Sequence, residues 1–350
     1  MNLFAVCSPG LETAVARELG AIAGVRDART TPGGVDFEGD FATLCRANLC
    51  LRAASRVLVR VGDIDASDFP KLERSAANLP WEPFAAKPVR VTWAVTVRKS
   101  RLYHTGAIAE RIGRSMKVTS DPSAPELHVV VRGEQDRFTI SVDSSGELLH
   151  RRGYRLETAK APLRETLAAG VLALAGWDPL TPLGDPMCGS GTFVIEAALL
   201  ALSRAPGLMR RFAFQDWPQF SAPRFAKIVD ELRRRENRSS PLLWGSDRDA
   251  GTIAAATRNA ERAEVLPDVR FACVDIAQVK PSAPGLIVCN LPYGRRLAAP
   301  KAPITALFRL AEGSRLAVLT ADKRLFKRRP DAEYRLDNGG LPVWLCVFEA

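Results

Sequence analysis

The chain has 350 residues, of which 47% are apolar, and 49 Lys and Arg residues against 39 Asp and Glu residues give it a net charge of +10. This length corresponds to about two domains, and the apolar share excludes a disordered or fibrous protein. The excess of positive charge favours a polyanionic partner, with nucleic acid as the first candidate. No apolar run reaches the roughly 18 residues that cross a membrane, and no secretory leader is evident, so we expect a cytoplasmic protein without membrane contact.

The seven cysteines form no Cys-x-x-Cys pair, and the three histidines lie far apart in the sequence. Because zinc sites need closely spaced ligands, we expect no bound metal. Free thiols agree with a reducing cytoplasm.

The first part of the chain alternates between the two apolar periods that mark strands and helices. Its pattern predicts, in chain order, a strand over 2–8, a helix over 12–22, a strand over 33–39, a helix over 41–54, strands over 56–64 and 89–98, a helix over 106–118, and a hairpin of 126–134 with 137–143. This mixed α+β region ends near Gly146.

From residue 148 onward, short apolar strands alternate with helices, a pattern typical of a mostly parallel sheet in an α/β domain. The expected elements are a helix over 162–177 and strands over 181–185, 242–247, 269–275, 286–290 and 315–322. Each strand ends in or near a polar residue, at the edge where an open α/β sheet binds its ligand.

Three features complete the expected architecture of this second part. An insertion rich in Arg and aromatic residues, at about 204–240, ends in a helix. Residues 276–284 are too few for a regular parallel crossover, so we expect a short irregular one. Runs over 333–337 and 343–349 flank an Asn-Gly-Gly turn and predict an antiparallel hairpin at the sheet edge.

A glycine turn lies between a predicted strand and a predicted helix at residues 184–202, GDPMCGSGTFVIEAALLAL. Gly189 and Gly191 let the backbone approach a ligand at the helix N-terminus. The turn is not a Walker A loop, because Ser190 stands where that motif requires Lys. A dinucleotide-binding turn is disfavoured because Val194 replaces its last Gly.

Carboxylates follow three successive strands, and they suit a cationic ligand with hydroxyl groups. S-adenosylmethionine is such a ligand: Asp185 would face its amino group, Asp247 its ribose hydroxyls, and Asp275 its adenine amine. A purely structural turn is the alternative. The candidate cofactor-binding residues are Asp185, Pro186, Met187, Cys188, Gly189, Gly191, Thr192, Asp247, Arg248, Asp275 and Ile276. No His neighbours Cys188 in sequence, so we interpret this cysteine as a packed residue and not as a nucleophile.

The strand over 286–290 ends in a second motif, Asn-Leu-Pro-Tyr. An exocyclic base amine is a poor nucleophile because its lone pair is delocalised into the ring, and hydrogen-bond acceptors aimed at the amine oppose this delocalisation. The Asn290 side-chain oxygen and the Leu291 carbonyl would accept the two amine hydrogens. Tyr293 would stack on the extruded base, while Pro292 would hold the turn. A plain Asn-x-Pro turn is the alternative.

Together, DPMCGSGT, the acids of GSDRDA and CVDI, and NLPYG resemble the class I AdoMet-dependent methyltransferases that act on exocyclic amines. Residues 98–113 and 148–170 are similar to those of the THUMP-containing RNA guanine-N2 methyltransferases related to the N-terminal half of the large-subunit rRNA methyltransferase L. The resemblance implies a ferredoxin-like part over 1–55, a THUMP RNA-binding domain over 56–147 and a Rossmann-like methyltransferase domain over 148–350. Leu291 departs from this pattern, because the family usually has Pro there.

Basic residues gather around residues 98–117, around 151–164 and around 323–329. A single run of this kind is more often a solvated face, but three such runs interleaved with tyrosines favour contact with phosphates and bases. The predicted RNA contacts are Arg98, Lys99, Arg101, Tyr103, His104, Arg151, Arg152 and Tyr154.

The expected activity is methyl transfer from S-adenosylmethionine to the N2 amine of a guanine in structured RNA, with 23S rRNA favoured and no metal involved. An enzyme of the same fold that modifies tRNA guanine N2 or adenine N6 is one alternative, because the motif recognises an amine and not the ring behind it. A non-catalytic RNA-binding or assembly factor is the other. The oligomeric state is left open, with a monomer favoured.

Overall fold

The computed structural model describes residues 1–350 except 157–162, 238, 281–282 and 293–300. The described residues form two seven-stranded sheets. Within these residues, no helix combines the length and the apolar character needed to cross a membrane.

The first sheet begins with a ferredoxin-like unit that packs two helices against four strands. Its elements are β1 (Asn2–Cys7), α1 (Glu12–Gly20), β2 (Arg26–Thr31), β3 (Gly34–Glu38), α2 (Phe41–Cys50) and β4 (Ala54–Asp65). Helix α2 begins where the Asp40 side chain accepts a hydrogen bond from the Thr43 N–H at 2.8 Å, a standard N-cap. The predicted strands and helices of this region are present, but the structure adds β2 between α1 and β3, and the helices end earlier than expected.

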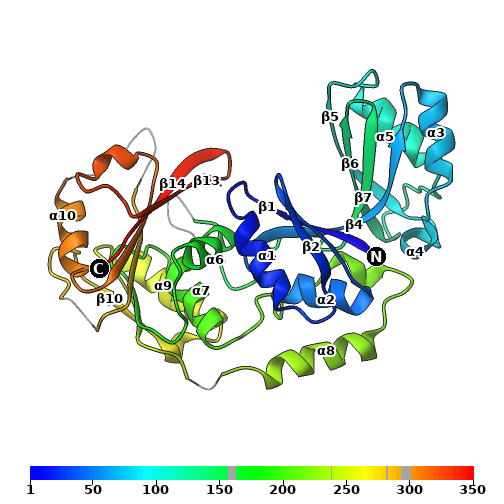
Figure 1. Ribbon diagram of the computed structural model, residues 1–350. Helices are drawn as coiled ribbons and strands as arrows, with labels where there is room; N and C mark the ends of the chain where they lie inside the picture. The colour runs from blue at the N-terminus through cyan, green and yellow to red at the C-terminus, as the bar shows by residue number, and fades with distance from the viewer. Residues whose placement is uncertain (157–162, 238, 281–282, 293–300) are drawn as a thin grey trace.

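Strand β4 is shared between the ferredoxin-like unit and an outer lobe. Its first half pairs with β1, with Leu3 opposite Val59, and its second half pairs with β7 as far as Asp65 opposite Arg137. Figure 1 shows the outer lobe standing apart from the rest of the molecule. Its elements are α3 (Phe69–Ala77), α4 (Glu82–Ala85), β5 (Arg90–Arg98), α5 (Thr105–Gly113), β6 (Glu126–Glu134) and β7 (Arg137–Asp143).

The second sheet has the strand order β10-β9-β8-β11-β12-β14-β13, in which the first five strands are parallel and β14 is antiparallel to β12 and β13. The predicted parallel sheet with a terminal antiparallel hairpin is therefore confirmed. Its strands are β8 (Leu183–Asp185), β9 (Leu243–Asp247), β10 (Val269–Cys273), β11 (Leu286–Asn290), β12 (Arg315–Thr320), β13 (Ala332–Asn338) and β14 (Leu341–Phe348).

Helices cover both faces of this sheet. In β11, Leu286 and Val288 belong to the apolar core that includes α6 and α7, whereas Ile287 and Cys289 pack on the other face with Leu307 of α10. This alternation explains why a strand buried on both faces reads as a continuous apolar run. The helices are α6 (Glu165–Leu174), α7 (Thr192–Ala201), α8 (Ala222–Arg234), α9 (Ala250–Arg262) and α10 (Lys301–Leu310), with short 3₁₀ turns η1 (Ala213–Asp216), η2 (Leu266–Asp268) and η3 (Lys323–Leu325).

The segment predicted as an insertion contains η1 and α8, and its aromatic side chains fasten the second domain to the first. Phe214 lies 5.8 Å from Phe41 of α2 in an edge-to-face arrangement, and Trp217 lies 4.9 Å from Phe84 of α4. Phe214 and Trp217 are buried. These rings therefore hold the domains together and are unavailable for stacking on RNA bases.

Candidate active site

Four of the predicted site residues lie at one edge of the second sheet. Asp185 pairs with Gly245 across β8 and β9, and Gly184 pairs with Ile287 across β8 and β11. Because these strands are parallel, the carboxyl ends that carry Asp185, Asp247, Asp275 and Asn290 meet at the same edge. The order of the sheet reverses between β8 and β11, where open α/β sheets bind their ligands.

The glycine loop between β8 and α7 has one open side. Gly191 has φ +84°, and a Cβ there would lie 3.1 Å from Ala256 Cβ and 3.1 Å from Phe271 Cζ, so close packing requires glycine. Gly189 has φ +53°, and no atom lies within 4 Å of the position that its Cβ would occupy. The backbone at Gly189 therefore borders open space beside a helix N-terminus, which fits a bound cofactor.

The carboxylate of Asp247 holds the glycine loop in place. It accepts hydrogen bonds from the Gly189 N–H and the Asp249 N–H, both at 3.1 Å. A carboxylate has about four acceptor positions, so Asp247 can still accept from ligand hydroxyls. Asp275 accepts from the Ala277 N–H at 2.9 Å, beside the buried Ile276.

Asp185 is buried beneath the loop, and its Oδ1 accepts from the Met187 N–H at 3.1 Å. Burial raises the pKa of Asp185 to about 8, in opposition to the Met187 hydrogen bond and with a further increase from the negative charge of Asp247. The carboxyl is therefore largely protonated at neutral pH in the free protein. A cation bound nearby would favour its charged form.

Asn290 ends β11 with its side-chain oxygen buried and without a hydrogen-bond partner among the described residues. Leu291 follows, and its N–H donates to Leu319 O at 2.9 Å, which extends the β11–β12 ladder by one bond. A proline at this position would lack that donor. The departure at Leu291 thus adds a hydrogen bond that fixes the turn. Pro292 is half-buried, and Tyr293 lies outside the described residues.

Cys188 is buried in the glycine loop, and this burial raises the pKa of its thiol well above the ordinary value. A thiol of this kind is a poor nucleophile. The interpretation of Cys188 as a packed residue agrees with this environment. Of the other predicted cofactor residues, Pro186 and Thr192 are buried, Met187 is half-buried and Arg248 is exposed.

The predicted RNA contacts of the outer lobe are all exposed at the end of β5 and in the loop that follows it. Tyr103 is 80% exposed, and the ring of His104 accepts from the Ala107 N–H at 3.2 Å as the N-cap of α5. Arg101 lies 3.7 Å from Asp136. Arg98 and Lys99 have no ion pair among the described residues.

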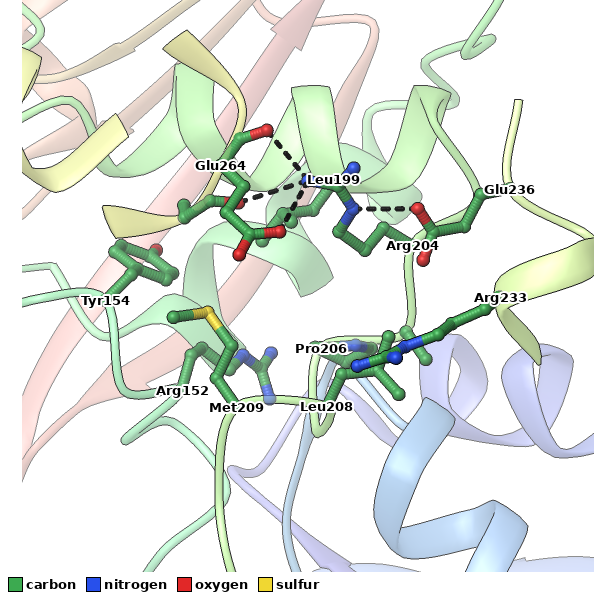
Figure 2. Close-up of a pocket in the computed structure, with 12 residues that line it drawn as sticks. Arg152, Tyr154, Leu199, Arg204, Pro206, Leu208, Met209, Arg233, Glu236 and Glu264 are labelled. Atoms are coloured by element: carbon green, nitrogen blue, oxygen red, sulfur yellow. Dashed lines mark hydrogen bonds and ion pairs between the residues drawn. The ribbon is translucent and has the colours of Figure 1, made fainter. Parts of the chain in front are cut away.

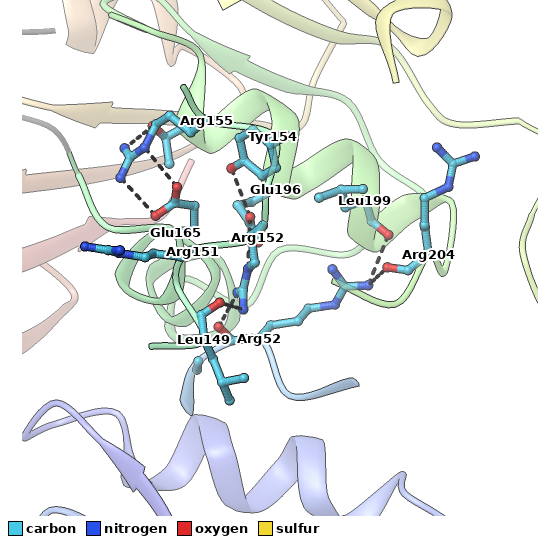
Figure 3. A network of polar contacts seen from close by, with 12 residues as sticks. Arg52, Leu149, Arg151, Arg152, Tyr154, Arg155, Glu165, Glu196, Leu199 and Arg204 are labelled. Carbon is cyan, nitrogen blue, oxygen red and sulfur yellow. Dashed lines mark hydrogen bonds and ion pairs between the residues drawn. The ribbon is translucent and has the colours of Figure 1, made fainter. Parts of the chain in front are cut away.

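The prediction that Arg152 and Tyr154 contact RNA is wrong, because both side chains are buried at the domain junction, with exposures of 2% and 1% (Figure 3). The Tyr154 hydroxyl donates to Glu196 Oε1 at 3.0 Å, and Arg152 Nε lies 3.5 Å from the same oxygen. Arg152 also donates to Leu149 O at 2.8 Å. Glu196, a charged residue on the otherwise apolar helix α7, is the sequence signal that a buried partner is needed.

A second pair at the junction, Arg155 with Glu165, was not predicted. Arg155 Nε lies 2.8 Å from Glu165, and Arg155 Nη1 donates to Leu163 O at 2.6 Å and lies 3.4 Å from Thr192 Oγ1 (Figure 3). Because Thr192 follows the glycine loop directly, this arginine joins the first turns of α6 and α7. The pair contributes to positioning the loop that borders the proposed cofactor space.

A cavity of about 420 Å³ lies on another part of the molecule, between the junction and the insertion (Figure 2). Arg204 crosses it and binds Glu236 at 3.0 Å and the Glu264 carbonyl at 2.8 Å. Two residues predicted to bind RNA, Arg152 and Tyr154, line this cavity, but none of the predicted cofactor residues does. Its charged groups chiefly hold the insertion in place.

The order of the second sheet, the glycine loop after its first strand and the acids at the next strand ends define a Rossmann-like class I methyltransferase. The family model described as "RMKL-like, methyltransferase domain" matches residues 152–333, and the "RlmL ferredoxin-like domain" matches residues 2–58. The chain belongs to this methyltransferase family, as its sequence motifs predict. The ferredoxin-like start of the chain is likewise confirmed.

Similar proteins cover the chain almost completely. The Synechocystis protein named "Putative RNA methyltransferase slr0064" is 32% identical over 99% of this chain and 96% of its own length. The "Ribosomal RNA large subunit methyltransferase K/L" of Syntrophotalea carbinolica is 34% identical over 100% of this chain and 53% of its own length. The chain thus spans about half the length of the K/L relatives.

Solved structures that are similar to the chain are also titled as methyltransferases or methylases. The structure titled "SMU.472, a putative methyltransferase complexed with SAH" has a TM-score of 0.87 and 29% identity, covering 100% of this chain and 98% of that one. A "predicted N6-adenine-specific DNA methylase" from Listeria monocytogenes has a TM-score of 0.87 and 30% identity, covering 99% of this chain and 95% of that one.

Proposed function

We propose that the chain is an RNA methyltransferase that transfers a methyl group from S-adenosylmethionine to the exocyclic N2 amine of a guanine in structured RNA, with 23S rRNA as the favoured substrate. The K/L relatives act, by their names, on large-subunit ribosomal RNA. The single observation that supports an amine as the methyl acceptor is the buried side-chain oxygen of Asn290, which has no hydrogen-bond partner among the described residues.

A buried acceptor without a partner costs roughly 1–3 kcal/mol, so it is rarely left in a folded protein without a role. The Asn290 oxygen lies at the ligand-binding edge of the sheet, next to the Leu291 carbonyl. An amine that donates to it would satisfy this orphaned group. This supports a substrate with N–H donors at the reacting atom.

The cofactor is assigned to the open side of the glycine loop. Asp247 would accept from its ribose hydroxyls and Asp275 from its adenine amine. The buried Asp185 would ionise next to the cofactor's cationic groups, because a nearby positive charge lowers the pKa of a carboxyl. When bound, S-adenosylmethionine supplies an electrophilic methyl group on a positively charged sulfur.

Asn290 and Leu291 act on the nucleophile. By accepting the two hydrogens of the amine, their oxygens keep electron density on the nitrogen and orient its lone pair away from the hydrogen-bonded side. Tyr293 is assigned the role of stacking on the extruded base, as the motif predicts. After transfer, the nitrogen is positively charged because it still holds both of its hydrogens beside the new methyl group. One of these hydrogens then leaves to solvent as a proton.

The outer lobe is assigned to RNA binding, as a THUMP domain that holds the substrate at a distance from the active site. Its exposed residues Arg98, Lys99 and Tyr103 offer two cations and a stacking ring. Arg151, at the junction, is exposed but already pairs with Glu147 at 3.0 Å.

The direct experiment incubates the full chain with unmodified 23S rRNA made by transcription in vitro and with methyl-labelled S-adenosylmethionine, followed by mass spectrometry of the nucleosides. N2-methylguanosine is the expected product, and the Asn290→Ala variant is expected to form it about 100-fold more slowly. N6-methyladenosine in its place would contradict the guanine assignment and would agree with the name of the Listeria structure. Labelling of tRNA alone would contradict the rRNA assignment, and RNA binding without any methylation would favour an assembly factor.

A further inference from the structure

The N-terminus of α6 lies at the catalytic edge of the second sheet. Arg164 is the N-cap residue of α6, and Glu165 is the first residue of that helix. Through Arg155, Glu165 is joined to Thr192, which follows the glycine loop. Arg164 therefore sits near the loop that borders the proposed cofactor space.

Arg164 is the arginine of this junction that no acid neutralises among the described residues. Arg151 pairs with Glu147 at 3.0 Å, Arg152 lies 3.5 Å from Glu196, and Arg155 lies 2.8 Å from Glu165. Arg164 is exposed and has neither an ion pair nor a side-chain hydrogen bond within the described part of the chain.

The local field around Arg164 is positive. The neighbouring His150 has its pKa lowered to about 4, first by burial and then by the guanidinium groups of Arg164, Arg155, Arg152 and Arg151. A neutral histidine adds no charge, and Arg151, Arg152 and Arg155 each lie beside a glutamate, so among these four arginines the positive charge that no described acid offsets is that of Arg164. The positive charge at Arg164 would attract an anion to this position.

The guanidinium of Arg164 lies close to the turn of the β13–β14 hairpin. A Cβ on Gly339, in the turn of the β13–β14 hairpin, would lie only 3.2 Å from Arg164 Nη2. The hairpin in turn rests on the first domain, because a Cβ on Gly10 would lie 2.5 Å from Arg335 O and 2.8 Å from Leu336 Cδ2. Arg164 thus lies where α6 meets the hairpin, near the ferredoxin-like unit, and no acid among the described residues neutralises it.

We propose that Arg164 binds a backbone phosphate of the RNA substrate close to the target nucleotide and so positions that nucleotide at the active site. The inference rests on the proposed function. A planar guanidinium recognises a phosphate through two parallel hydrogen bonds, which fixes orientation as well as charge. The proposal places this phosphate on the RNA between the part that the outer lobe would bind and the nucleotide at Asn290.

The test compares Arg164→Gln with Arg234→Gln. Arg234 is also exposed and without a partner among the described residues, but it lies on α8, at the opposite side of the molecule in Figure 1 from the hairpin. Filter binding to unmodified 23S rRNA transcript should give Arg164→Gln a Kd about tenfold larger than that of the wild type at low salt. The slope of log Kd against log salt concentration should also fall by roughly 0.7–0.9. Arg234→Gln should change Kd less than twofold.

Calorimetry with S-adenosylmethionine separates the two anions that could reach Arg164. Unchanged cofactor affinity in Arg164→Gln supports a phosphate of the RNA, whereas a tenfold loss of cofactor affinity with unchanged RNA binding overturns the proposal in favour of the cofactor carboxylate. Arg164→Lys keeps the positive charge but not the planar group that forms two parallel hydrogen bonds. This variant should retain most of the RNA affinity but only part of the wild-type kcat/KM. Equal RNA-binding losses in Arg164→Gln and Arg234→Gln would also overturn it.

Binding and methylation are measured separately, so the two proposals fail in different ways. A wild-type chain that binds the transcript but does not methylate it contradicts the proposed function, and the comparison of Kd values at Arg164 still decides the phosphate contact. A wild-type chain that methylates the transcript, together with an Arg164→Gln variant of unchanged Kd and kcat/KM, contradicts the Arg164 proposal alone.

Discussion

The domain junction and the catalytic edge both contain buried polar side chains, and each has an oxygen without a partner among the described residues, Glu196 Oε2 at the junction and Asn290 Oδ1 at the edge. The two regions differ in what surrounds these groups. At the junction, Glu196 accepts from Tyr154 while Arg152 also donates to backbone carbonyls. At the catalytic edge, the Asn290 oxygen has no partner among the described residues, and the backbone at Gly189 faces open space. The contacts of Tyr154 and Arg152 at the junction join segments of the chain, whereas the edge combines an unpartnered amide oxygen with open space beside the glycine loop.

This contrast shows that residue type alone does not identify a binding surface. Arginine interleaved with tyrosine is typical of RNA-binding segments, yet the same pattern at residues 152–154 forms a buried network. What distinguishes the two cases is burial, since the exposed Arg101 also lies 3.7 Å from a carboxylate, that of Asp136. The experiments that follow separate cohesion from ligand binding, in order of decreasing effect.

The largest effect is expected from Arg152→Ala, which removes one of the two guanidinium groups, those of Arg152 and Arg52, whose charge acts on the buried Glu196. Breaking a buried pair in this way costs about 3–5 kcal/mol in the free energy of unfolding, measured by urea denaturation followed by tryptophan fluorescence. Arg151→Ala is the matched control, because its exposed pair with Glu147 contributes less than about 1 kcal/mol. Equal losses in the two variants would contradict the contrast between a buried network and a solvated pair.

Asn290→Ala is expected to reduce kcat by about 100-fold, through loss of an acceptor that positions and polarises the amine. Its free energy of unfolding should be unchanged or higher, because the substitution removes a buried group that has no partner. Asn290→Asp keeps an oxygen at the same place and should retain more activity. A loss of stability in Asn290→Ala would mean that the Asn290 side chain stabilises the fold, as the polar groups of the junction do.

Asp185→Asn tests the charge state of the buried acid through pH. The pKa of Asp185 is raised to about 8, so between pH 4 and 8 the folded chain holds a proton that the unfolded chain has lost. The free energy of unfolding should therefore fall as pH rises, by roughly 2 kcal/mol between pH 6 and 8. The variant should lack this part of the slope, and an identical pH profile in both proteins would show that Asp185 is ionised in the folded state.

Two glycine variants give the smallest effects. Gly189→Ala and Gly191→Ala both strain a backbone with positive φ, at a cost of roughly 1–2 kcal/mol in stability. Only at Gly191 does the new methyl group also meet packed atoms, so Gly191→Ala should be the less stable variant. Gly189→Ala should show about a tenfold weaker cofactor Kd by calorimetry, because its methyl group enters the open space. Unchanged affinity would remove Gly189 from the cofactor site.

Most strands of the second sheet were predictable because they are short, largely apolar and followed by a polar residue, whereas β10 and β13 contain several exposed residues. The placement of Asp247 and Asn290 at one edge followed from the parallel order alone. Strand β2, with the sequence RDARTT, was not predicted, since none of its residues is buried and it exists only through pairing with β3. Helix α3, Phe69–Ala77, was also missed, although the Asp68 side chain caps it.

The burial of Arg152 could not be read from its neighbours in sequence. Its partner Glu196 lies 44 residues further along the chain, on a helix that packs beside it only in the folded structure. The lone glutamate of FVIEAALLAL did signal that some cation must reach it, but not which of several nearby arginines. Long-range pairing of this kind depends on how the domains are docked, and local patterns do not encode that arrangement.

The continuity of β4 through the ferredoxin-like unit and the outer lobe has a consequence for how far the lobe can reach. The twelve-residue strand β4 pairs with β1 through its first half and with β7 through its second, with a register shift between Arg60 and Gly62. A hydrogen-bonded strand resists bending more than a flexible linker does. The lobe is therefore held at a nearly constant separation from the glycine loop. An RNA anchored on the lobe would present only nucleotides at one span from the anchor, so the strand acts as a ruler in the choice of target.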